Sequence, residues 1–399
     1  MRVLHVTLTL SRLATGTHAF LWSLVASLKE LGVESVVAGL HDDFVDQDTA
    51  SYREMARIET RPAVGWWPLG LSPRLWKLVD SLANHVDVVH LHGLRNLLGR
   101  RTRVAALSAG KPLVISPHGQ LEPWVLRQRF WRKMIVDPLW ERRNLRAASL
   151  LHATSVPECE HIRGYGMTNP VAVVPAGVNP NQFLTEPDPL AIAARFPVLA
   201  GKRLLLFHSR LIPRKGLFAL AEAWGRLAPR FPEWQLAVAG FDEHGFRRKV
   251  VAAIERAGVK DRTTFVGELR DPWRVRMLAS ASLFVLPTFS ENFGIVVLEA
   301  LASGCPVVTT TGTPWSMLPE RGCGWWVDAE PPSLAGALAD AMSRSDKELR
   351  IMGQRGRALV ESDFTWQSVA NQMHQVYIWL VRGGEKPPCI LTPLQAGSR

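Results

Sequence analysis

Apolar runs of strand length alternate along the first half of the chain with longer segments of helical periodicity. The runs "RVLHVTL" (2–8), "VDVVHLHG" (86–93) and "KPLVISPHG" (111–119) are rich in β-branched residues and predict buried strands. The segment 17–32 has apolar residues at helical spacing and ends in glycine, which predicts a helix. Strands that alternate with helices predict a parallel sheet with crossover helices.

The same rhythm begins again after a stretch rich in proline and polar residues. "KRLLLFHSRL" (202–211), "WQLAVAG" (234–240) and "ASLFVLPT" (281–288) predict strands, and "FGIVVLEALASG" (293–304) predicts a helix. Two such series predict an α/β protein with two doubly wound domains, which bind ligands at the carboxyl ends of their strands.

Length and pattern together indicate the domain organisation. Because 399 residues exceed what one hydrophobic core usually supports, we expect two domains. The expected parts are a first domain over 1–185, a linker over 186–201, a second domain over 202–364, a helix over 365–382 that crosses back to the first domain, and a flexible tail over 383–399.

Composition adds the class of protein and its compartment. Hydrophobic residues make up 47% and charged residues 21% of the chain, as in ordinary globular proteins. No apolar run reaches the roughly 18 residues that span a bilayer. The opening "MRVLHVTLTLSRLATG" predicts a strand and not a signal peptide. The four cysteines form no CxxC pair, so we expect no zinc site, no disulfide framework and a reducing cytoplasm.

The chain is basic, with a net charge of +11, and this charge favours anionic partners without identifying them. The segment 124–146 combines seven Lys and Arg residues with three tryptophans. Two interpretations of it remain open. It is either a basic amphipathic helix on an anionic membrane surface, or a helix whose apolar side packs on the core.

Two cations lie at the end of the predicted strand at 202–211 or just after it, and both precede a helix. Arg210 and Lys215 lie in a loop that Gly216 closes. Cations at the carboxyl end of a strand suit the pyrophosphate of a nucleotide. The alternative is a surface loop with two solvated cations.

The string "SENFGIVVLEALASG" carries two carboxylates. Glu291 falls in a turn after a strand, and Glu299 lies about two turns into the next helix. The first amides of that helix, near Gly294, are free donors that suit a phosphate. A buried carboxylate needs hydrogen-bond donors, and a ribose diol supplies two. The alternative for Glu299 is a surface position on an amphipathic helix.

The first half offers fewer candidates. His118 ends a predicted strand at the edge where ligands bind, although a lone histidine is usually structural. His90 and His92 alternate onto one face of their strand, where packing is the alternative to function. The acidic "HDDFVD" (41–46) has no histidine at ligand spacing, so we expect no metal site. The chain has no P-loop, GxSxG or GxGxxG motif.

Taken in order, these motifs resemble the retaining glycosyltransferases of family 4 (glycosyl transferases group 1). The E-x7-E pattern from Glu291 to Glu299 is followed by "ALASGCPVV" and preceded by "FHSRLIPRKG", "LAVAG" and "FVGEL". With "DVVHLHG", "ISPHG" and "VAVVPAGVN", the similarity extends over about residues 1–380. It implies the GT-B fold, in which two doubly wound Rossmann-like domains face each other across a deep cleft. It also implies a metal-independent, retaining hexosyltransferase without a cofactor beyond its nucleoside-diphosphate-sugar co-substrate.

The resemblance assigns roles to the matching positions. The implied catalytic residues are Glu291, His118, Arg210 and Lys215. The implied donor-binding residues are Gly16, Arg210, Lys215, Gly267, Glu268, Leu269, Glu291, Asn292, Phe293, Gly294, Ile295 and Glu299. Arg210 and Lys215 would neutralise the diphosphate, Glu299 would hold the ribose, and His118 would lie against the transferred sugar. The backbone over 267–269 would meet the nucleobase.

We therefore expect transfer of a sugar from a UDP- or GDP-sugar to a carbohydrate or lipid-linked acceptor. The expected setting is bacterial exopolysaccharide or lipopolysaccharide biosynthesis, in the cytoplasm or at the inner face of the plasma membrane, with 124–146 as the membrane contact and no nucleic acid as partner. One alternative is a GT-B-like nucleotide-sugar epimerase or phosphorylase. The other is a non-catalytic basic protein that binds nucleic acid.

Overall fold

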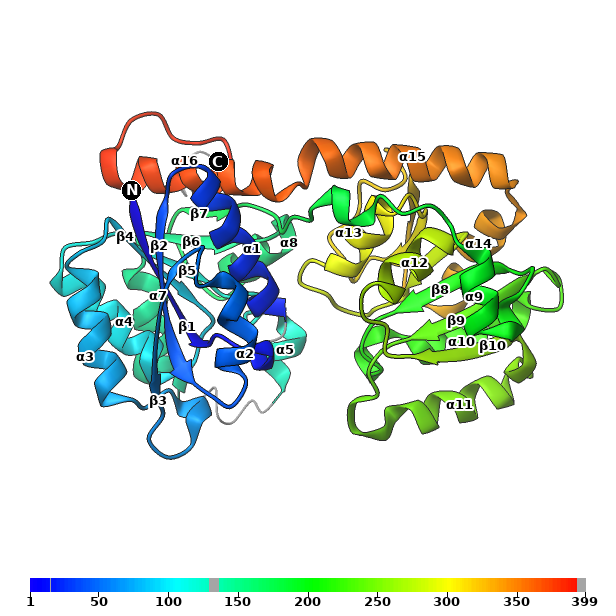
Figure 1. Ribbon diagram of the computed structural model, residues 1–399, viewed down its shortest axis with the longest axis horizontal. Coiled ribbons are helices and arrows are strands. Elements are labelled where there is room, and N and C mark those ends of the chain that lie inside the picture. Colours follow the sequence, from blue (N-terminus) through cyan, green and yellow to red (C-terminus); the bar gives the residue numbers. More distant parts are fainter. Residues whose placement is uncertain (15, 129–135, 393–399) are drawn as a thin grey trace, which may run out of the picture. The chain divides into compact units, whose positions relative to one another are not determined.

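The computed structural model describes residues 1–14, 16–128 and 136–392, and they form two compact α/β units (Figure 1). Unit 1 comprises Met1–Ala176 and Trp366–Arg399, and unit 2 comprises Gly177–Thr365. Each unit is a sheet of parallel strands, with one antiparallel edge strand in unit 1, and is covered by helices, as the alternating pattern predicts.

Unit 1 is built on an eight-stranded sheet in the order β14-β7-β6-β5-β4-β1-β2-β3. Its strands are β1 (Arg2–Thr9), β2 (Glu34–His41), β3 (Arg57–Pro62), β4 (Val88–His92), β5 (Leu113–Ser116), β6 (Leu150–Ala153), β7 (Val171–Val173) and β14 (Ile390–Leu391). All neighbouring strands are parallel except β14 and β7, which are antiparallel. The strand order reverses between β1 and β4, which is the switch point of a doubly wound sheet.

Helices cover both faces of this sheet. They are α1 (Gly16–Glu30), α2 (Val45–Thr49), α3 (Pro73–Ala83), α4 (Leu97–Ser108), α5 (Pro123–Arg127), α7 (Arg142–Ala147), α8 (Val156–Gly164) and α16 (Trp366–Arg382). Helix α3 packs against α4, and α1 packs against α16 (Figure 1).

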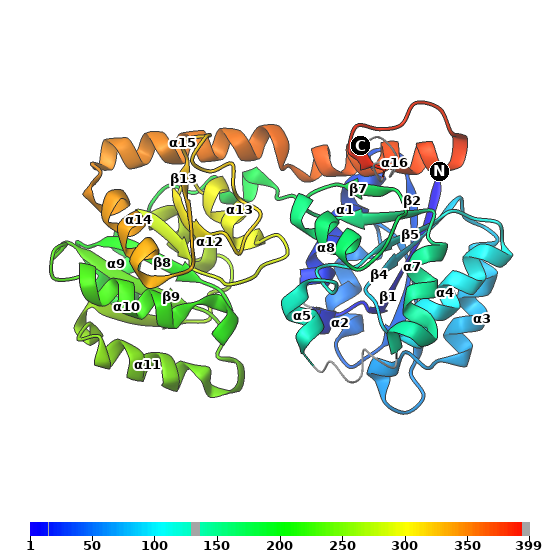
Figure 2. The ribbon, with the colours of Figure 1, turned by 180° about the vertical axis from the view of Figure 1, so that it is seen from behind.

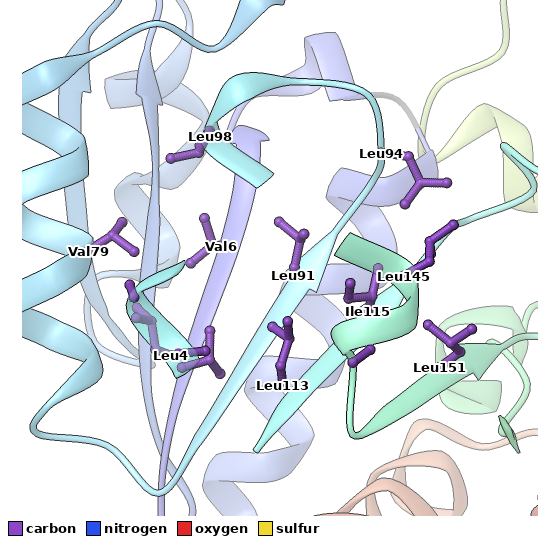
Figure 3. Close-up of a cluster of buried hydrophobic side chains, with 14 of the residues drawn as sticks. Leu4, Val6, Val79, Leu91, Leu94, Leu98, Leu113, Ile115, Leu145 and Leu151 are labelled. Atoms are coloured by element: carbon purple, nitrogen blue, oxygen red, sulfur yellow. The ribbon is translucent and has the colours of Figure 1, made fainter. Parts of the chain in front are cut away.

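The two faces of the unit 1 sheet differ in chemistry because successive side chains of a strand point to opposite sides. Leu4 and Val6 of β1 belong to one apolar cluster with Val79 of α3 and Leu98 of α4 (Figure 3). His5 lies between them in sequence and therefore points to the other face, which α1 and α16 cover.

Unit 2 is built on a six-stranded parallel sheet in the order β10-β9-β8-β11-β12-β13. Its strands are β8 (Arg203–His208), β9 (Trp234–Ala239), β10 (Thr263–Gly267), β11 (Leu283–Leu286), β12 (Val307–Thr310) and β13 (Gly324–Val327). Its helices are α9 (Pro189–Arg195), α10 (Leu217–Leu227), α11 (Phe246–Arg256), α12 (Trp273–Ser280), α13 (Ile295–Ala302), α14 (Pro331–Ser343) and α15 (Asp346–Asp363). Helix α10 packs against α11 and α14, whereas α13 packs against α12 and α15 (Figure 2).

The unit boundaries differ from the expected divisions at 185 and 201. The first segment of unit 1 ends at Ala176, and the segment 186–201 contains α9. Ile192 and Leu199 of this segment are 2% and 3% exposed, so its apolar residues pack into unit 2 in place of forming a linker. The helix expected over 365–382 is α16, which belongs to unit 1.

The end of the chain also differs from the flexible tail expected over 383–399. Strand β14 pairs with β7, and the Val173 amide donates to the Cys389 carbonyl at 2.8 Å. Ile390 is 2% exposed, so burial of this one side chain explains why the segment joins the sheet. Residues 393–399 lie outside the described part of the chain.

The basic segment 124–146 is interrupted and does not form the single helix expected. Helix α5 ends at Arg127, the backbone of the next residue, Gln128, is extended, and a π-helix (Asp137–Glu141) leads into α7. Residues 129–135, with three of the seven cations, lie outside the described residues. Among the residues that are described, no helix has both the length and the apolar composition needed to cross a bilayer.

Part of this segment packs inward through acidic residues. The Arg95 guanidinium donates to Asp137 at 2.9 Å, and the Arg95 amide donates to Glu141 at 2.6 Å. Burial raises the pKa of Glu141 to about 7, although Arg95 opposes the shift. The opposite side carries Leu139, which is 58% exposed, between the exposed cations of α5 and α7.

Candidate active site

The loop after β8 in unit 2 is a turn of 3-10 helix (Pro213–Lys215) that Gly216 ends. Gly216 has a φ of 73°, and a Cβ atom there would stand 1.8 Å from the Pro287 carbonyl oxygen. Only glycine therefore lets this loop approach the loop after β11. As a result, Lys215 is held at the carboxyl ends of two neighbouring strands.

The carbonyl of Arg214 ties the two loops together. It accepts hydrogen bonds from the Phe289 amide at 2.9 Å and the Thr288 hydroxyl at 3.1 Å. The next turn is fixed by the Glu291 amide, which donates to the Gly312 carbonyl at 2.7 Å. These bonds bring the side chains of Lys215 and Glu291 into contact, although 76 positions separate them in sequence.

Lys215 and Glu291 form a buried ion pair. The Lys215 residue is 5% exposed and the Glu291 side chain 17%. Burial lowers the pKa of Lys215, and Glu291 opposes this shift. Burial alone would raise the pKa of Glu291, but Lys215, with Arg214 and Arg210, outweighs it and holds the pKa below its usual range. The surroundings are thus positive and suited to an anion.

Helix α13 begins beside this pair. Gly294 precedes it with a φ of 82°, and a Cβ atom there would lie 3.3 Å from Glu291. Among the described residues, no side chain caps the helix, so its first amides are open to a ligand at the positive end of the helix dipole. The backbone of Phe293 is held in position because its carbonyl accepts a hydrogen bond from the indole of Trp315 at 2.7 Å.

Glu299 is largely buried, as expected for a carboxylate against a ligand, but it has a protein partner. Its carboxylate forms an ion pair with Arg274 of α12, which also donates to Asp271 at 3.0 Å. Burial raises the pKa of Glu299, and Arg274 opposes the shift. The sequence reading missed Arg274, for which the helical periodicity of α12 gave no signal.

The ends of β9 and β10 lie on the other side of β8. The Gly240 amide donates to the Gly267 carbonyl at 2.8 Å, which fixes the backbone where Gly267, Glu268 and Leu269 follow β10. His208 at the end of β8 is a second residue that sequence reasoning missed. Burial lowers its pKa to about 4, and its Nδ1 atom has no hydrogen-bond partner among the described residues.

Unit 2 thus brings most of the predicted donor-binding residues to one sheet edge. Those at the carboxyl edge of its strands are Arg210, Lys215, Gly267, Glu268, Leu269, Glu291, Asn292, Phe293, Gly294, Ile295 and Glu299. The arrangement offers cations, helix amides and carboxylates, which suit a phosphate and a polyol.

Two predicted residues belong to unit 1. Gly16 starts α1, and a Cβ atom there would meet nothing within 4 Å. His118 follows β5 with a φ of 50°, which is unusual for a residue with a side chain. The ring of Phe20 packs edge-on against the His118 ring, with 5.2 Å between the ring centroids. The Nε2 atom of His118 lies 3.1 Å from Nδ1 of His92.

Three buried histidines of unit 1 are grouped closely enough to be considered as metal ligands. Nitrogen atoms of His5, His90 and His92 lie within 4.8 Å of one another. Both ring nitrogens of His90, however, are in 2.7 Å hydrogen bonds, to Tyr377 and Ser116. A metal there would have to break one of these bonds, so the donor set fits a hydrogen-bond network better than a metal site.

Two family models match separate parts of the chain. The model described as "Glycosyltransferase Family 4" matches residues 14–182, in unit 1 and the first residues of unit 2. The model described as "Glycosyl transferases group 1" matches residues 192–359, within unit 2.

Named relatives agree with these models. The MMP alpha-(1->4)-mannosyltransferase of Mycolicibacterium hassiacum is 28% identical over 324 residues, 78% of this chain and 74% of the relative. The GDP-mannose-dependent monoacylated alpha-(1-6)-phosphatidylinositol monomannoside mannosyltransferase of Corynebacterium glutamicum is 29% identical over 51% of this chain and 55% of the relative.

A solved structure has the same fold. The Anabaena protein HepE, in complex with UDP and glucose, superimposes with a TM-score of 0.75 at 20% identity, covering 94% of this chain and 99% of HepE. This likeness concerns the fold, and the family models concern the sequence. The chain belongs to the group 1 glycosyltransferases of the family 4 type, GT-B enzymes that transfer a sugar from a nucleotide-sugar donor.

Proposed function

We propose that the protein transfers a hexose from a UDP- or GDP-sugar to a carbohydrate or lipid-linked acceptor, with retention of the anomeric configuration. The observation that carries this proposal is the buried pair of Lys215 and Glu291 beside the uncapped start of α13. The 28–29% identity to two mannosyltransferases supports a hexose as the transferred group.

The leaving diphosphate is the group that needs most stabilisation. Breaking the glycosidic bond to the diphosphate builds negative charge on the distal phosphate. Lys215, Arg210 and the first amides of α13 stabilise that charge from fixed positions, so no water has to reorganise and no metal ion is required. Burial makes each interaction stronger than it would be in water.

The remaining residues bind and position the donor. Glu299 accepts hydrogen bonds from the ribose hydroxyls, and Arg274 pairs with its carboxylate and opposes the rise in pKa that burial causes. Glu291 contacts hydroxyls of the sugar while it holds Lys215 in place. The backbone at Gly267, Glu268 and Leu269 meets the nucleobase. His118 of unit 1 contacts the transferred sugar.

The acceptor side of the proposal rests on charge and exposure. Trp124 is 38% exposed and Leu139 58%, beside exposed cations of α5 and α7. Apolar side chains among cations favour an anionic membrane surface. We place the enzyme at the inner face of the plasma membrane, in exopolysaccharide or lipopolysaccharide biosynthesis.

The test supplies UDP-glucose and GDP-mannose in parallel and measures release of the nucleoside diphosphate and formation of a glycoside. We expect release with one nucleotide and not with the other. Lys215→Ala should lower kcat at least about a hundredfold, because one preorganised charge stabiliser is worth that much. Full activity of the variant would rule out this site.

Controls separate the alternatives. An epimerase would convert the donor sugar without releasing nucleotide, and a phosphorylase would require inorganic phosphate. Arg226→Ala removes an exposed cation of α10 outside the site and should leave turnover unchanged.

A further inference from the structure

Two hydrogen-bonded chains of histidines cross the face of the unit 1 sheet that α1 and α16 cover. In the first chain, His152 Nε2 lies 2.9 Å from the Val174 carbonyl, and His152 Nδ1 lies 2.7 Å from the Ser116 hydroxyl. That hydroxyl lies 2.7 Å from His90 Nε2, and His90 Nδ1 lies 2.7 Å from the Tyr377 hydroxyl.

The carbonyl determines the direction of every bond in this chain. A carbonyl only accepts, so His152 carries its proton on Nε2 and accepts at Nδ1 from Ser116. The Ser116 oxygen then accepts from His90 Nε2, and His90 Nδ1 accepts from the Tyr377 hydroxyl. Burial lowers the pKa of His152 to about 4 and that of His90 well below its usual value, so both imidazoles are neutral, and these bonds then hold each in one tautomer.

The second chain leads from the centre of the sheet to a residue of the candidate site. His5 Nδ1 lies 3.1 Å from His92 Nε2, and His92 Nδ1 lies 3.1 Å from His118 Nε2. His5 and His92 are fully buried, whereas His118 is partly exposed. Burial favours the neutral imidazole in all three, with the pKa of His5 and of His118 lowered to about 3.

The inner end of the second chain favours one direction. A neutral imidazole has one N–H donor and one acceptor nitrogen, so all bonds of the chain point the same way. His5 Nε2 is buried without a partner among the described residues. If His118 donated to His92 and His92 donated to His5, then His5 would carry on Nε2 a buried N–H without an acceptor. If His5 donates to His92 and His92 donates to His118, Nε2 of His5 carries only an unpaired lone pair, which is less costly.

We propose that His5 and His92 are positioning residues that hold His118 in its Nδ1–H tautomer. His92 donates to Nε2 of His118, so His118 offers its substrate a hydrogen-bond donor and no acceptor. The group it recognises is an oxygen with a free lone pair, a hydroxyl of the transferred sugar. This last statement rests on the proposed function, whereas the tautomer itself does not.

The conformation of His118 agrees with a fixed donor. Its left-handed backbone, with a φ of 50°, is costly for a histidine and persists only where the surroundings impose it. The Phe20 ring, inclined at 67° to the His118 ring, limits rotation of the imidazole. The ring orientation and the tautomer are thus both set by contacts within unit 1.

The test reads the tautomer of His118 in the full-length protein labelled with 15N-histidine. The His118 resonances are assigned by their loss in His118→Gln. We expect a protonated Nδ1 in the wild type. His92→Phe removes the donor and should produce a mixture of tautomers. His92→Asn is the matched control, because its amide nitrogen stands close to the position of Nδ1 and can still donate.

Turnover supplies a second reading. We expect kcat/KM to fall about fivefold in His92→Phe and to stay within about twofold in His92→Asn, since one neutral hydrogen bond is at stake. A wild-type His118 protonated on Nε2, or a tautomer unchanged in His92→Phe, would overturn the inference. Expected tautomers in a protein inactive with every donor would overturn the proposed function alone and still support the positioning role.

Discussion

At the scale of single residues, the ion pair of Lys215 and Glu291 is the central feature of the candidate site. Both side chains are largely buried. Burial lowers the pKa of Lys215 while Glu291 opposes the shift, and Lys215 helps to hold the pKa of Glu291 below its usual range. Such pairs add little stability over an apolar pair, but breaking one leaves an uncompensated charge. The pair is therefore better explained by function than by stability.

We expect a double-mutant cycle to reveal this dependence. Glu291→Gln and Lys215→Met should each lower the free energy of unfolding by about 3 kcal/mol, and the double variant should lose less than the sum. Urea unfolding gives the four values. The exposed pair of Arg226 and Glu222 on α10 is the control, with a coupling below about 0.5 kcal/mol. Simple additivity at Lys215 and Glu291 would contradict the buried pair.

Sequence reasoning located residues near the ends of elements more easily than their partners. Lys215 and Glu291 follow predicted strands, so their place at the sheet edge could be read from the pattern. His208 ends β8 and carried the same signal, but it was overlooked. Arg274 could not be found this way. The contact of Arg274 with Glu299 depends on how α12 packs against α13, and no local pattern encodes that packing.

At the scale of elements, the alternation of side chains divides the unit 1 sheet into an apolar face and a histidine face. The alternation in β4 predicted that His90 and His92 share a face, and they do. Their neighbours on that face come from β1, β6 and α16, as far as 287 positions away for Tyr377. Local pattern fixes the face, whereas the fold decides which residues meet there.

The histidine face should make unit 1 sensitive to acid. His5, with a pKa of about 3 against an ordinary 6.5, binds its proton in the unfolded chain at a higher pH than in the folded one. Stability is therefore complete above about pH 6.5 and falls as the pH drops toward 3. Hydrogen exchange of β1 amides between pH 7 and 4.5, corrected for intrinsic rates, measures the slope.

A matched pair of variants isolates the contribution of one histidine. His5→Phe should reduce the slope by up to about 1.4 kcal/mol per pH unit. The same replacement of the exposed His41 should leave it unchanged. An equal slope in His5→Phe and wild type would mean that His5 is not held neutral.

Strand β14 contributes to the same sheet through one buried side chain. Ile390→Ala should lower the stability of unit 1 by about 2 kcal/mol, since Ile390 is 2% exposed. Leu391, its neighbour, is 43% exposed, and Leu391→Ala should change little. Hydrogen exchange of the β7 amides distinguishes the two. Equal effects would argue against the pairing of β14 with β7.

At the scale of the whole molecule, two similar sheets carry different chemistry. Unit 2 presents cations, helix amides and carboxylates, whereas unit 1 presents neutral histidines. The repeated strand–helix rhythm predicted two doubly wound domains. It did not predict the boundaries of the domains. The segment 186–201 packs into unit 2 through Ile192 and Leu199, but its proline-rich composition is typical of a linker.

A nucleotide should therefore protect unit 2 selectively. We expect saturating UDP or GDP, whichever the enzyme uses, to slow hydrogen exchange after β8, after β11 and at the start of α13. At a hundred times Kd the gain is about 2.7 kcal/mol for openings that release the ligand. The nucleotide that gives no turnover is the control. Protection spread evenly over unit 2 would argue against a localised site.

The discontinuity of unit 1 has a consequence for synthesis on the ribosome. Unit 2 is one continuous stretch, from Gly177 to Thr365, and is complete once that stretch has left the exit tunnel. The first part of unit 1 precedes unit 2 in the chain, but unit 1 lacks α16 and β14 until the residues that follow unit 2 have been synthesised. The histidine face in the first 176 residues is incomplete until Tyr377 has been synthesised. The unit whose synthesis starts before that of unit 2 is therefore the unit that finishes folding after it.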